Sequence, residues 1–364
     1  MLPARNTIPS VLFLLTVCQW QTPAIAQAAT RPASVISPTT ASATAPASGP
    51  AYAAPVGPHA VITSDATWQD KARGREVPVR IYAPDANTAA GPLPAIVISH
   101  GLGGSRVGYA YLARHLAGHG YLCVVPTHLG SDTSILLGGG WGSLLNALGD
   151  ANNLVLRPGD VSFVIGRMTA PDAPAVLKGR VDANRIGVAG HSFGAYTALA
   201  VAGQTIRTGD GNERGFGDER VKAAIAMSPQ GPGRIGLSEK SWDAVRIPVM
   251  IMTGSRDYSL GGSLDVRSRR YAFDHMPPGE KYLLWIEYAS HLAFSDNDRN
   301  PMDLGQFIQR DPRHHPWILA AATAFFDACL KGDAKARDWL RQGQIEKVSD
   351  GQAKLERRPK NGGQ

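Results

Sequence analysis

The stretch GVAGHSFGAYTALAVAG, residues 187–203, decides the fold of this chain. An apolar run typical of a strand leads into G-x-S-x-G at residues 190–194, and an alanine-rich segment typical of a helix follows. A serine on such a strand-to-helix turn is the setting of a nucleophile elbow. Gly190 and Gly194 permit a close backbone approach that a Cβ would block, and the start of the helix favours negative charge near Ser192. The alternative is that Ser192 is only a small residue at an ordinary turn.

Short continuous apolar runs recur on both sides of this stretch and predict further strands. Runs of this kind suit strands that are covered on both faces, as in a parallel sheet. The predicted strands are 77–84, 94–100, 121–128, 185–191, 221–229, 247–254 and 281–289. Helical patterns lie between or after them at 109–120, 160–168, 192–203 and 316–332. This alternation predicts an α/β fold with a mostly parallel, doubly wound sheet and helices on both faces.

Four segments are expected along the chain. Residues 1–28 have the layout of a cleaved signal peptide, with Arg5 before a short apolar run and small residues at the cleavage site, which predicts a secreted or periplasmic protein. Residues 29–58 are rich in Ala, Pro, Ser and Thr and predict a disordered linker. Residues 59–332 form the predicted catalytic domain, and 333–364 a charged terminal helix and frayed tail. The sequence around Cys18 is only a loose match to a lipid-attachment site.

Composition narrows the class of protein. A hydrophobic fraction of 43% and a charged fraction of 18% indicate a chain able to bury a large core. The net charge of +7 is scattered, and without an aromatic-interleaved basic strip it gives no reason to expect nucleic-acid binding. The apolar run near the N-terminus is too short for a membrane span. No metal-binding spacing occurs, and Cys123 and Cys329 are expected to be separate thiols.

A serine nucleophile needs a base and an orienting acid, in the chain order Ser, Asp or Glu, His. Asp257 and His291 each follow a predicted strand, so both are expected at the carboxyl edge of the sheet, beside Ser192. His291 would accept the serine proton and Asp257 would fix the imidazole tautomer. Asp265, in a predicted helix, and Asp296, close to His291 along the chain, are weaker candidates for the acid.

The sequence HGLGGS, residues 100–105, follows a predicted strand where an oxyanion loop would lie. Backbone N–H groups of such a loop can bind a developing oxyanion. We expect one donor from Phe193 and the other from Leu102, with Gly101 as the competing choice. An ordinary glycine-rich turn is the alternative.

Together these segments resemble the α/β-hydrolase superfamily over residues 94–332. The loop HGLGGS and the motif GHSFG are similar to those of the platelet-activating factor acetylhydrolase branch and the dienelactone-hydrolase-like proteins. The resemblance implies hydrolysis of a small-molecule or lipid ester by a serine nucleophile, without metal or cofactor. Dienelactone hydrolases use cysteine where this chain has Ser192. Polyester-degrading cutinases share the architecture but carry an aromatic residue where this chain has Leu102.

The connection between the third and fourth predicted strands, residues 131–157, is apolar and predicts a lid or a substrate-pocket wall, with a packed helical excursion as the alternative. Substrate contacts are expected from Leu136, Leu137, Trp141 and His191. Within RPGD, Asp160 is expected to cap the helix that follows, and Arg157 to lie at its start. An amidase, an acyltransferase or an inactive binding protein could use the same fold.

Overall fold

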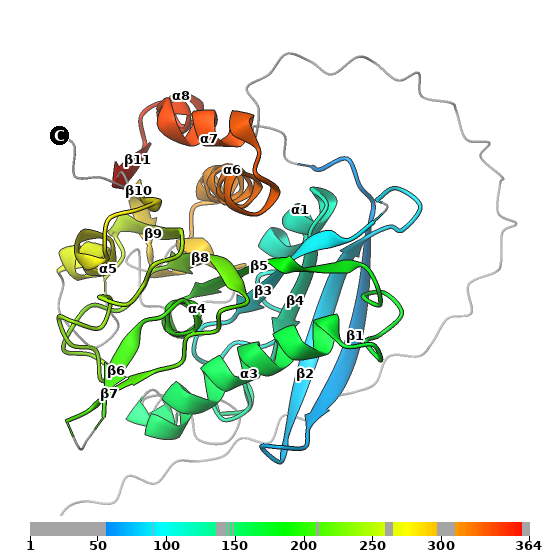
Figure 1. Ribbon diagram of the computed structural model, residues 1–364. Helices are drawn as coiled ribbons and strands as arrows, with labels where there is room; N and C mark the ends of the chain where they lie inside the picture. The colour runs from blue at the N-terminus through cyan, green and yellow to red at the C-terminus, as the bar shows by residue number, and fades with distance from the viewer. Residues whose placement is uncertain are drawn as a thin grey trace, which may run out of the picture. The chain divides into compact units, whose positions relative to one another are not determined.

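One mixed sheet organises the part of the chain that the structure describes. In the computed structural model this part is residues 56–358, apart from 90, 136–142, 144, 145, 148, 209, 210, 259–264 and 297–309. Within it, nine strands pair in the order β1-β2-β4-β3-β5-β8-β9-β10-β11 (Figure 1). The strands are β1 (Val61–Asp70), β2 (Arg75–Pro84), β3 (Leu93–Ser99), β4 (Leu122–Pro126), β5 (Val181–His191), β8 (Val221–Met227), β9 (Val249–Arg256), β10 (Lys281–Ser290) and β11 (Ala353–Arg358).

The six central strands, β4 to β10 in the sheet order, run parallel to one another. Their apolar runs are continuous because successive side chains point to opposite faces and both faces are covered. Val97, Val188 and Ile251 belong to one buried cluster, whereas Ile98, Ala189 and Met252 belong to the other. Because the strands are parallel, the loops after them meet at one edge of the sheet. The predicted doubly wound α/β class is confirmed.

Helices cover both faces of the sheet (Figure 1). One face packs against α3 (Ala151–Thr169), α4 (Phe193–Val201) and α5 (Tyr271–His275). The other packs against α1 (Ala110–Gly118), α6 (His314–Phe326), α7 (Ala334–Arg341) and α8 (Gln344–Val348). Short elements complete the described chain: the hairpin β6 (Thr205–Arg207) and β7 (Glu213–Gly215), the 3-10 turns η1 (Val266–Arg270) and η2 (His291–Phe294), and the π-helical turn η4 (Asp327–Lys331).

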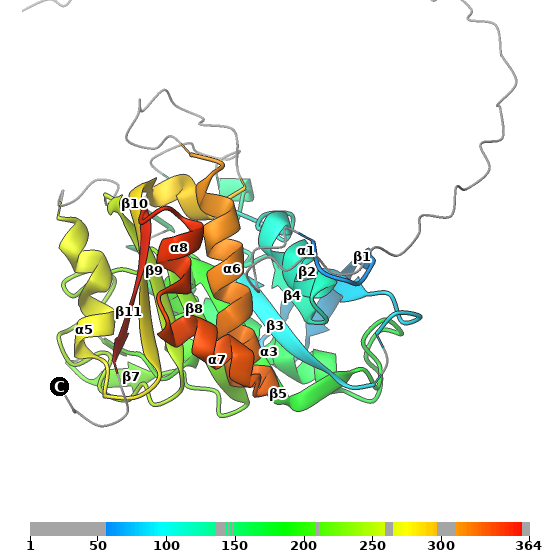
Figure 2. The same ribbon diagram turned by 90° about the horizontal axis from the view of Figure 1, so that it is seen from above.

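Two edge strands are absent from the sequence prediction. β1 pairs antiparallel with β2, and its residues are mostly half-buried or exposed, so it has no apolar run. β11 pairs antiparallel with β10 at the opposite edge of the sheet (Figure 2). Its sequence, AKLERR, carries several charged residues. The strand tolerates them because only Ala353 is fully buried, and the other side chains are half-buried or exposed. The expectation of a frayed tail was therefore wrong for residues 353–358, which extend the sheet.

Helix α3 begins nine residues before the predicted cap. Asp150, not Asp160, is the N-cap, and its carboxylate accepts from the N–H of Asn152 at 2.9 Å. Residues 151–157 of the predicted insertion therefore belong to a helix of the core. Pro158 lies inside this helix and cannot donate to the carbonyl of Leu154. The hydroxyl of Tyr196 donates to that carbonyl instead, at 2.8 Å, which explains why the helix tolerates the proline.

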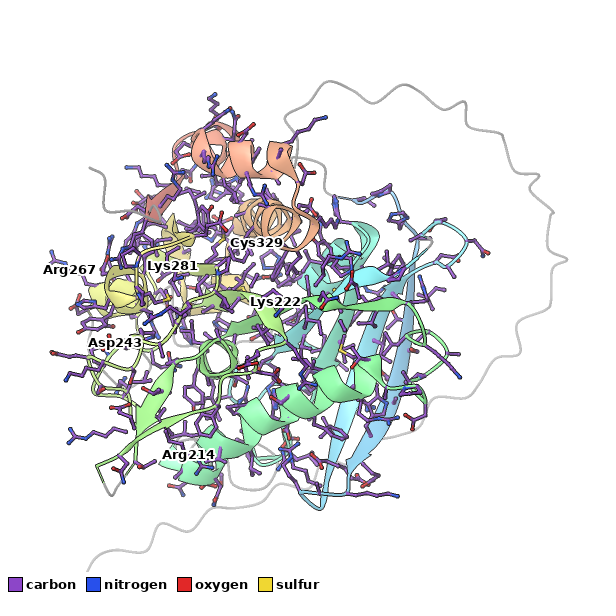
Figure 3. All side chains as sticks on the ribbon, viewed as in Figure 1. Arg214, Lys222, Asp243, Arg267, Lys281 and Cys329 are labelled. Atoms are coloured by element: carbon purple, nitrogen blue, oxygen red, sulfur yellow. The ribbon has the colours of Figure 1, made fainter. Side chains whose placement is uncertain are left out.

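Basic residues on the described part of the protein come from several separate elements. Arg214, Lys222 and Arg267 come from β7, β8 and η1 and lie apart in Figure 3. No helix in the described ranges is long and apolar enough to cross a membrane. Cys123 is buried on β4 and Cys329 is partly buried on η4, and neither forms a disulfide.

Candidate active site

Ser192 lies on a strained turn between β5 and α4. Its φ of 56° and ψ of −116° are unusual for a residue with a Cβ. Both flanking glycines are sterically required. A Cβ on Gly190 would lie 2.1 Å from the carbonyl oxygen of Gly194, and one on Gly194 would lie 2.0 Å from that of Ser99. The close backbone approach predicted from GHSFG is therefore present.

The structure brings Ser192, His291 and Asp257 together, although they come from three separate loops. Ser192 Oγ lies 2.9 Å from His291 Nε2, and His291 Nδ1 lies 2.9 Å from Asp257 Oδ1. A carboxylate only accepts hydrogen bonds, so Nδ1 carries the imidazole proton and Nε2 is free to accept from the serine hydroxyl. Asp257 is completely buried, whereas Ser192 is partly accessible. This arrangement has the hydrogen-bonding order that a nucleophile, a base and an orienting acid require.

Asp257 is held by groups that the sequence analysis did not identify. Thr253 Oγ1 donates to its Oδ2 at 2.8 Å, and the guanidinium of Arg269 lies 3.3 Å from its Oδ1. Burial opposes ionisation of this carboxyl, but Arg269 and the hydrogen bond from His291 outweigh it and lower the pKa of Asp257 below its ordinary value. Arg269 is itself fixed by the carbonyls of Ser228 and Pro229. Asp257 is thus an ionised partner for His291 at neutral pH.

The backbone around residues 100–104 distinguishes the two candidate oxyanion donors. Gly101 N–H donates to the hydroxyl of Tyr109 at 3.3 Å, and Gly103 N–H donates to the carbonyl of Ser131 at 2.9 Å. Within the described residues, Leu102 N–H has no acceptor. Phe193, the first residue of α4, is likewise at a position where helical N–H groups have no partner in the helix. The geometry therefore favours Leu102 over Gly101 as the second donor.

A buried polar network lies beneath the oxyanion loop. Arg157, only 1% exposed, donates to the carbonyl of His100 and to Ser99 Oγ, and its guanidinium stacks 4.5 Å from the ring centre of Phe193. Burial lowers the pKa of Arg157 to about 9, which leaves it charged at neutral pH. Arg157 therefore touches both segments that carry the candidate donors, which corrects the expectation that it only starts a helix.

Asp160 holds the same network from the other side. Its carboxylate lies 2.9 Å from Arg73 and from Arg75, and it accepts from His128 Nδ1 at 3.0 Å. His128 Nε2 in turn accepts from Ser99 at 2.9 Å, and the backbone N–H of His128 donates to His100 Nε2. His128 is thus a structural residue with no exposed surface.

Replacing Asp160 with Asn should destabilise the protein by about 3 kcal/mol, because the half-buried guanidinium groups of Arg73 and Arg75 lose a fully buried carboxylate. Urea unfolding at pH 7 measures this change. Asp172→Asn is the matched control, because Asp172 pairs with Arg167 at an exposed site and its loss should change stability little. Equal unfolding midpoints for the two variants would contradict a structural role for Asp160.

The remaining candidate residues fall in three groups. His191 is buried and contacts Tyr109 and His291 rather than an open surface, so its predicted substrate contact is absent. Leu136, Leu137 and Trp141 lie outside the described residues, as do the predicted signal peptide and Cys18. Asp265 caps η1, and Asp296 accepts from the first N–H groups of α1, so neither contacts His291 through its carboxylate.

Sequence reasoning missed Arg269, Arg157 and Tyr109 as parts of the site. Arg157 and Asp160 lie among apolar residues of 151–169, and this is the one signal that could have indicated buried charge there. Arg269 and Tyr109 carry no such signal. Among the described residues, no group of three or more His, Cys, Asp or Glu side chains could hold a metal ion.

Fold and site together define a doubly wound α/β protein with a Ser-His-Asp constellation at the carboxyl edge of its sheet. The chain belongs to the alpha/beta hydrolase family, whose sequence profile matches residues 96–354, well over half of its length. The fold predicted from the sequence is confirmed by this match.

Several bacterial cutinases are distant relatives. Cutinase est2 of Thermobifida alba is 26% identical over 243 residues, which are 65% of this chain and 66% of that protein. Cutinase 2 of Thermobifida cellulosilytica is 26% identical over 58% of this chain and 64% of its own length. The chain thus spans slightly less than two thirds of each of these relatives. A ferulic acid esterase from Streptomyces cinnamoneus has a similar fold, with a TM-score of 0.56, 23% identity, and coverage of 79% of this chain and 93% of the esterase.

Proposed function

We propose that this protein hydrolyses carboxylic esters through an acyl-enzyme formed on Ser192. The observation that carries the proposal is the chain of two 2.9 Å contacts from Ser192 through His291 to Asp257. The distant likeness to cutinases supports an ester as the substrate. Leu102 and Phe193 are the proposed oxyanion donors.

Each residue has a defined task in this reaction. His291 Nε2 accepts the proton of Ser192 as Oγ attacks the ester carbonyl, and then delivers it to the departing alcohol. The oxyanion of the tetrahedral intermediate would bind the N–H groups of Leu102 and Phe193, and each such donor contributes about 2.7–4 kcal/mol. A water molecule activated by His291 then releases the acid. Asp257, held ionised by Arg269, stabilises the imidazolium at both stages.

A fluorophosphonate probe tests the proposal directly. We expect one label per folded protein, on the peptide that contains Ser192, together with hydrolysis of p-nitrophenyl acetate. Prior treatment with the probe should abolish that hydrolysis. A folded protein that takes no label would favour the alternative of a binding protein on the same fold and would rule out catalysis by Ser192.

Substrate class is a finer part of the proposal. The motifs HGLGGS and GHSFG favour a small-molecule or lipid ester of the kind cleaved by platelet-activating factor acetylhydrolase-like enzymes, whereas the likeness to cutinases favours polyester substrates. A panel of p-nitrophenyl esters from acetate to palmitate, a phospholipid, a polyester film and an amide separates these classes. Preference for long chains would support a lid role for the segment after Ile135.

We also propose that the mature protein is exported after cleavage behind Ala26 or Ala28. N-terminal sequencing of protein recovered outside the cytoplasm tests this proposal.

A further inference from the structure

A chain of buried hydrogen bonds joins the proposed oxyanion loop to the loop of the proposed base. Gly101 N–H donates to Tyr109 Oη at 3.3 Å, and Tyr109 Oη lies 2.8 Å from His191 Nδ1. His191 Nε2 lies 2.8 Å from the backbone carbonyl oxygen of His291. The Tyr109 and His191 side chains are 5% and 3% exposed, so water does not compete for these bonds.

The donor and the acceptor of each hydrogen bond in this series follow from the groups at its two ends. A carbonyl oxygen can only accept, so His191 Nε2 must carry the ring proton. His191 Nδ1 is then an acceptor, and Tyr109 must donate its hydroxyl proton to it. The tyrosine oxygen keeps its lone pairs for the N–H of Gly101. Burial lowers the pKa of His191 to about 3, so the neutral ring that this pattern requires persists across the ordinary pH range.

The backbone of Tyr109 is held to the same place by an independent contact. Its φ of 60° is left-handed and unfavourable for a tyrosine. Asp296, two residues beyond η2, accepts from the N–H groups of Tyr109 and Ala110 at 2.7 and 2.6 Å. The start of α1 is therefore tied to the loop of His291 both through its backbone and through the Tyr109 side chain.

We propose that Tyr109 and His191 are positioning residues for ester hydrolysis, which set the oxyanion loop and His291 at a fixed separation. The inference rests on the proposed function. By occupying the N–H of Gly101, Tyr109 also leaves Leu102 N–H as the donor of this loop. Neither side chain takes part in proton transfer. Their effect is exerted on the transition state, in which the oxyanion donors must bind the carbonyl oxygen while the base takes the proton of Ser192.

The first test is Tyr109→Phe in the full chain, with p-nitrophenyl acetate as the substrate. We expect kcat to fall by about 10- to 100-fold, because small displacements of catalytic groups have effects of this size, while KM stays within about threefold. The inhibition constant of phenylboronic acid, which forms a tetrahedral adduct with a nucleophilic serine, should rise by a similar factor. A tyrosine with a merely structural role would change neither quantity.

Tyr121→Phe is the matched control. Its hydroxyl donates to Asp327, at the C-terminal end of α6, at 2.7 Å, so the same atom is lost from a buried tyrosine outside the site. This variant should lose stability but retain kcat and boronate affinity.

His191→Gln supplies a second, independent variant if Tyr109→Phe fails to fold. Glutamine can still donate to the carbonyl of His291 but cannot accept from Tyr109 in the same geometry. In the double variant, the loss of kcat should be close to the larger single loss, because residues that act as a unit are not additive. Multiplicative losses, or kcat and boronate affinity within twofold of wild type in both single variants, would overturn the inference. Failure of the proposed function is distinct, since the wild-type protein itself would then neither hydrolyse the ester nor take the fluorophosphonate label.

Discussion

Ser192→Ala should lower kcat for ester hydrolysis by at least about 10⁴-fold, because it removes the atom that attacks the carbonyl while the rest of the site remains. The fold should be unaffected. Ser192 is partly accessible, and among the described side chains its hydroxyl hydrogen-bonds to His291 only, so little packing is lost. Initial rates with p-nitrophenyl acetate and an unfolding curve measure the two quantities on one preparation.

Ser238→Ala is a suitable control for this prediction. The Ser238 hydroxyl bonds to Glu213, outside the Ser-His-Asp constellation, so its loss should leave kcat unchanged. A Ser192→Ala protein that kept a tenth of the wild-type rate would show that another group is the nucleophile.

Acidification from pH 7 to pH 5 should destabilise the folded protein by about 2 kcal/mol through His191 alone, and His100 and His128 should add to this loss, because all three are buried without a proton. Burial lowers the pKa of His100, His128 and His191 below the ordinary value of 6.5. The unfolded chain binds protons at these residues below about pH 6.5, whereas the folded chain does not. Stability therefore falls as the pH falls below that value, by about 1.4 kcal/mol per pH unit for each histidine.

A loss of this size is a substantial part of the stability of a typical domain, about 5–15 kcal/mol, so denaturant midpoints should decrease from pH 7.5 through 6.0 to 5.0. The lowered pKa of Asp257 acts in a different window, since it destabilises only as the pH falls below about 4.

Two substitutions check the assignment to buried histidines. His191→Gln should reduce the slope of stability against pH by about one proton, whereas Ser238→Ala, which removes no titrating group, should leave the slope unchanged. A stability that is flat between pH 7 and pH 5 would contradict the expectation.

The central strands and the order of the site residues could be predicted from the chain alone. Each parallel strand is buried on both faces, so its apolar run is visible without its neighbours. The loops after such strands must meet at one edge, which is why Asp257 and His291 could be matched to Ser192 although they lie 65 and 99 positions away.

Edge strands, whose residues are partly exposed to water, could not be predicted from continuous apolar runs. β1 and β11 are edge strands whose polar residues face water, and their sequences carry no continuous apolar run. Helix α3 was shortened in the prediction because Pro158 normally marks the first turn of a helix. Only the contact with Tyr196, which satisfies the carbonyl of Leu154, permits a proline in its interior.

The sequence by itself determined the parallel centre of the sheet, the elbow at Ser192 and the residues expected to act with it, because hydrophobic periodicity and glycine sterics are local properties of the chain. The tertiary structure alone decided that Arg157 and Asp160 are buried, that Arg269 faces Asp257, and that Tyr109 reaches His191. Each of these polar groups is tolerated in the interior only because partners from distant segments satisfy it; Tyr109 and His191, for example, are 82 residues apart. A buried polar contact of this kind depends on where two segments meet, and neither segment carries a signal of it.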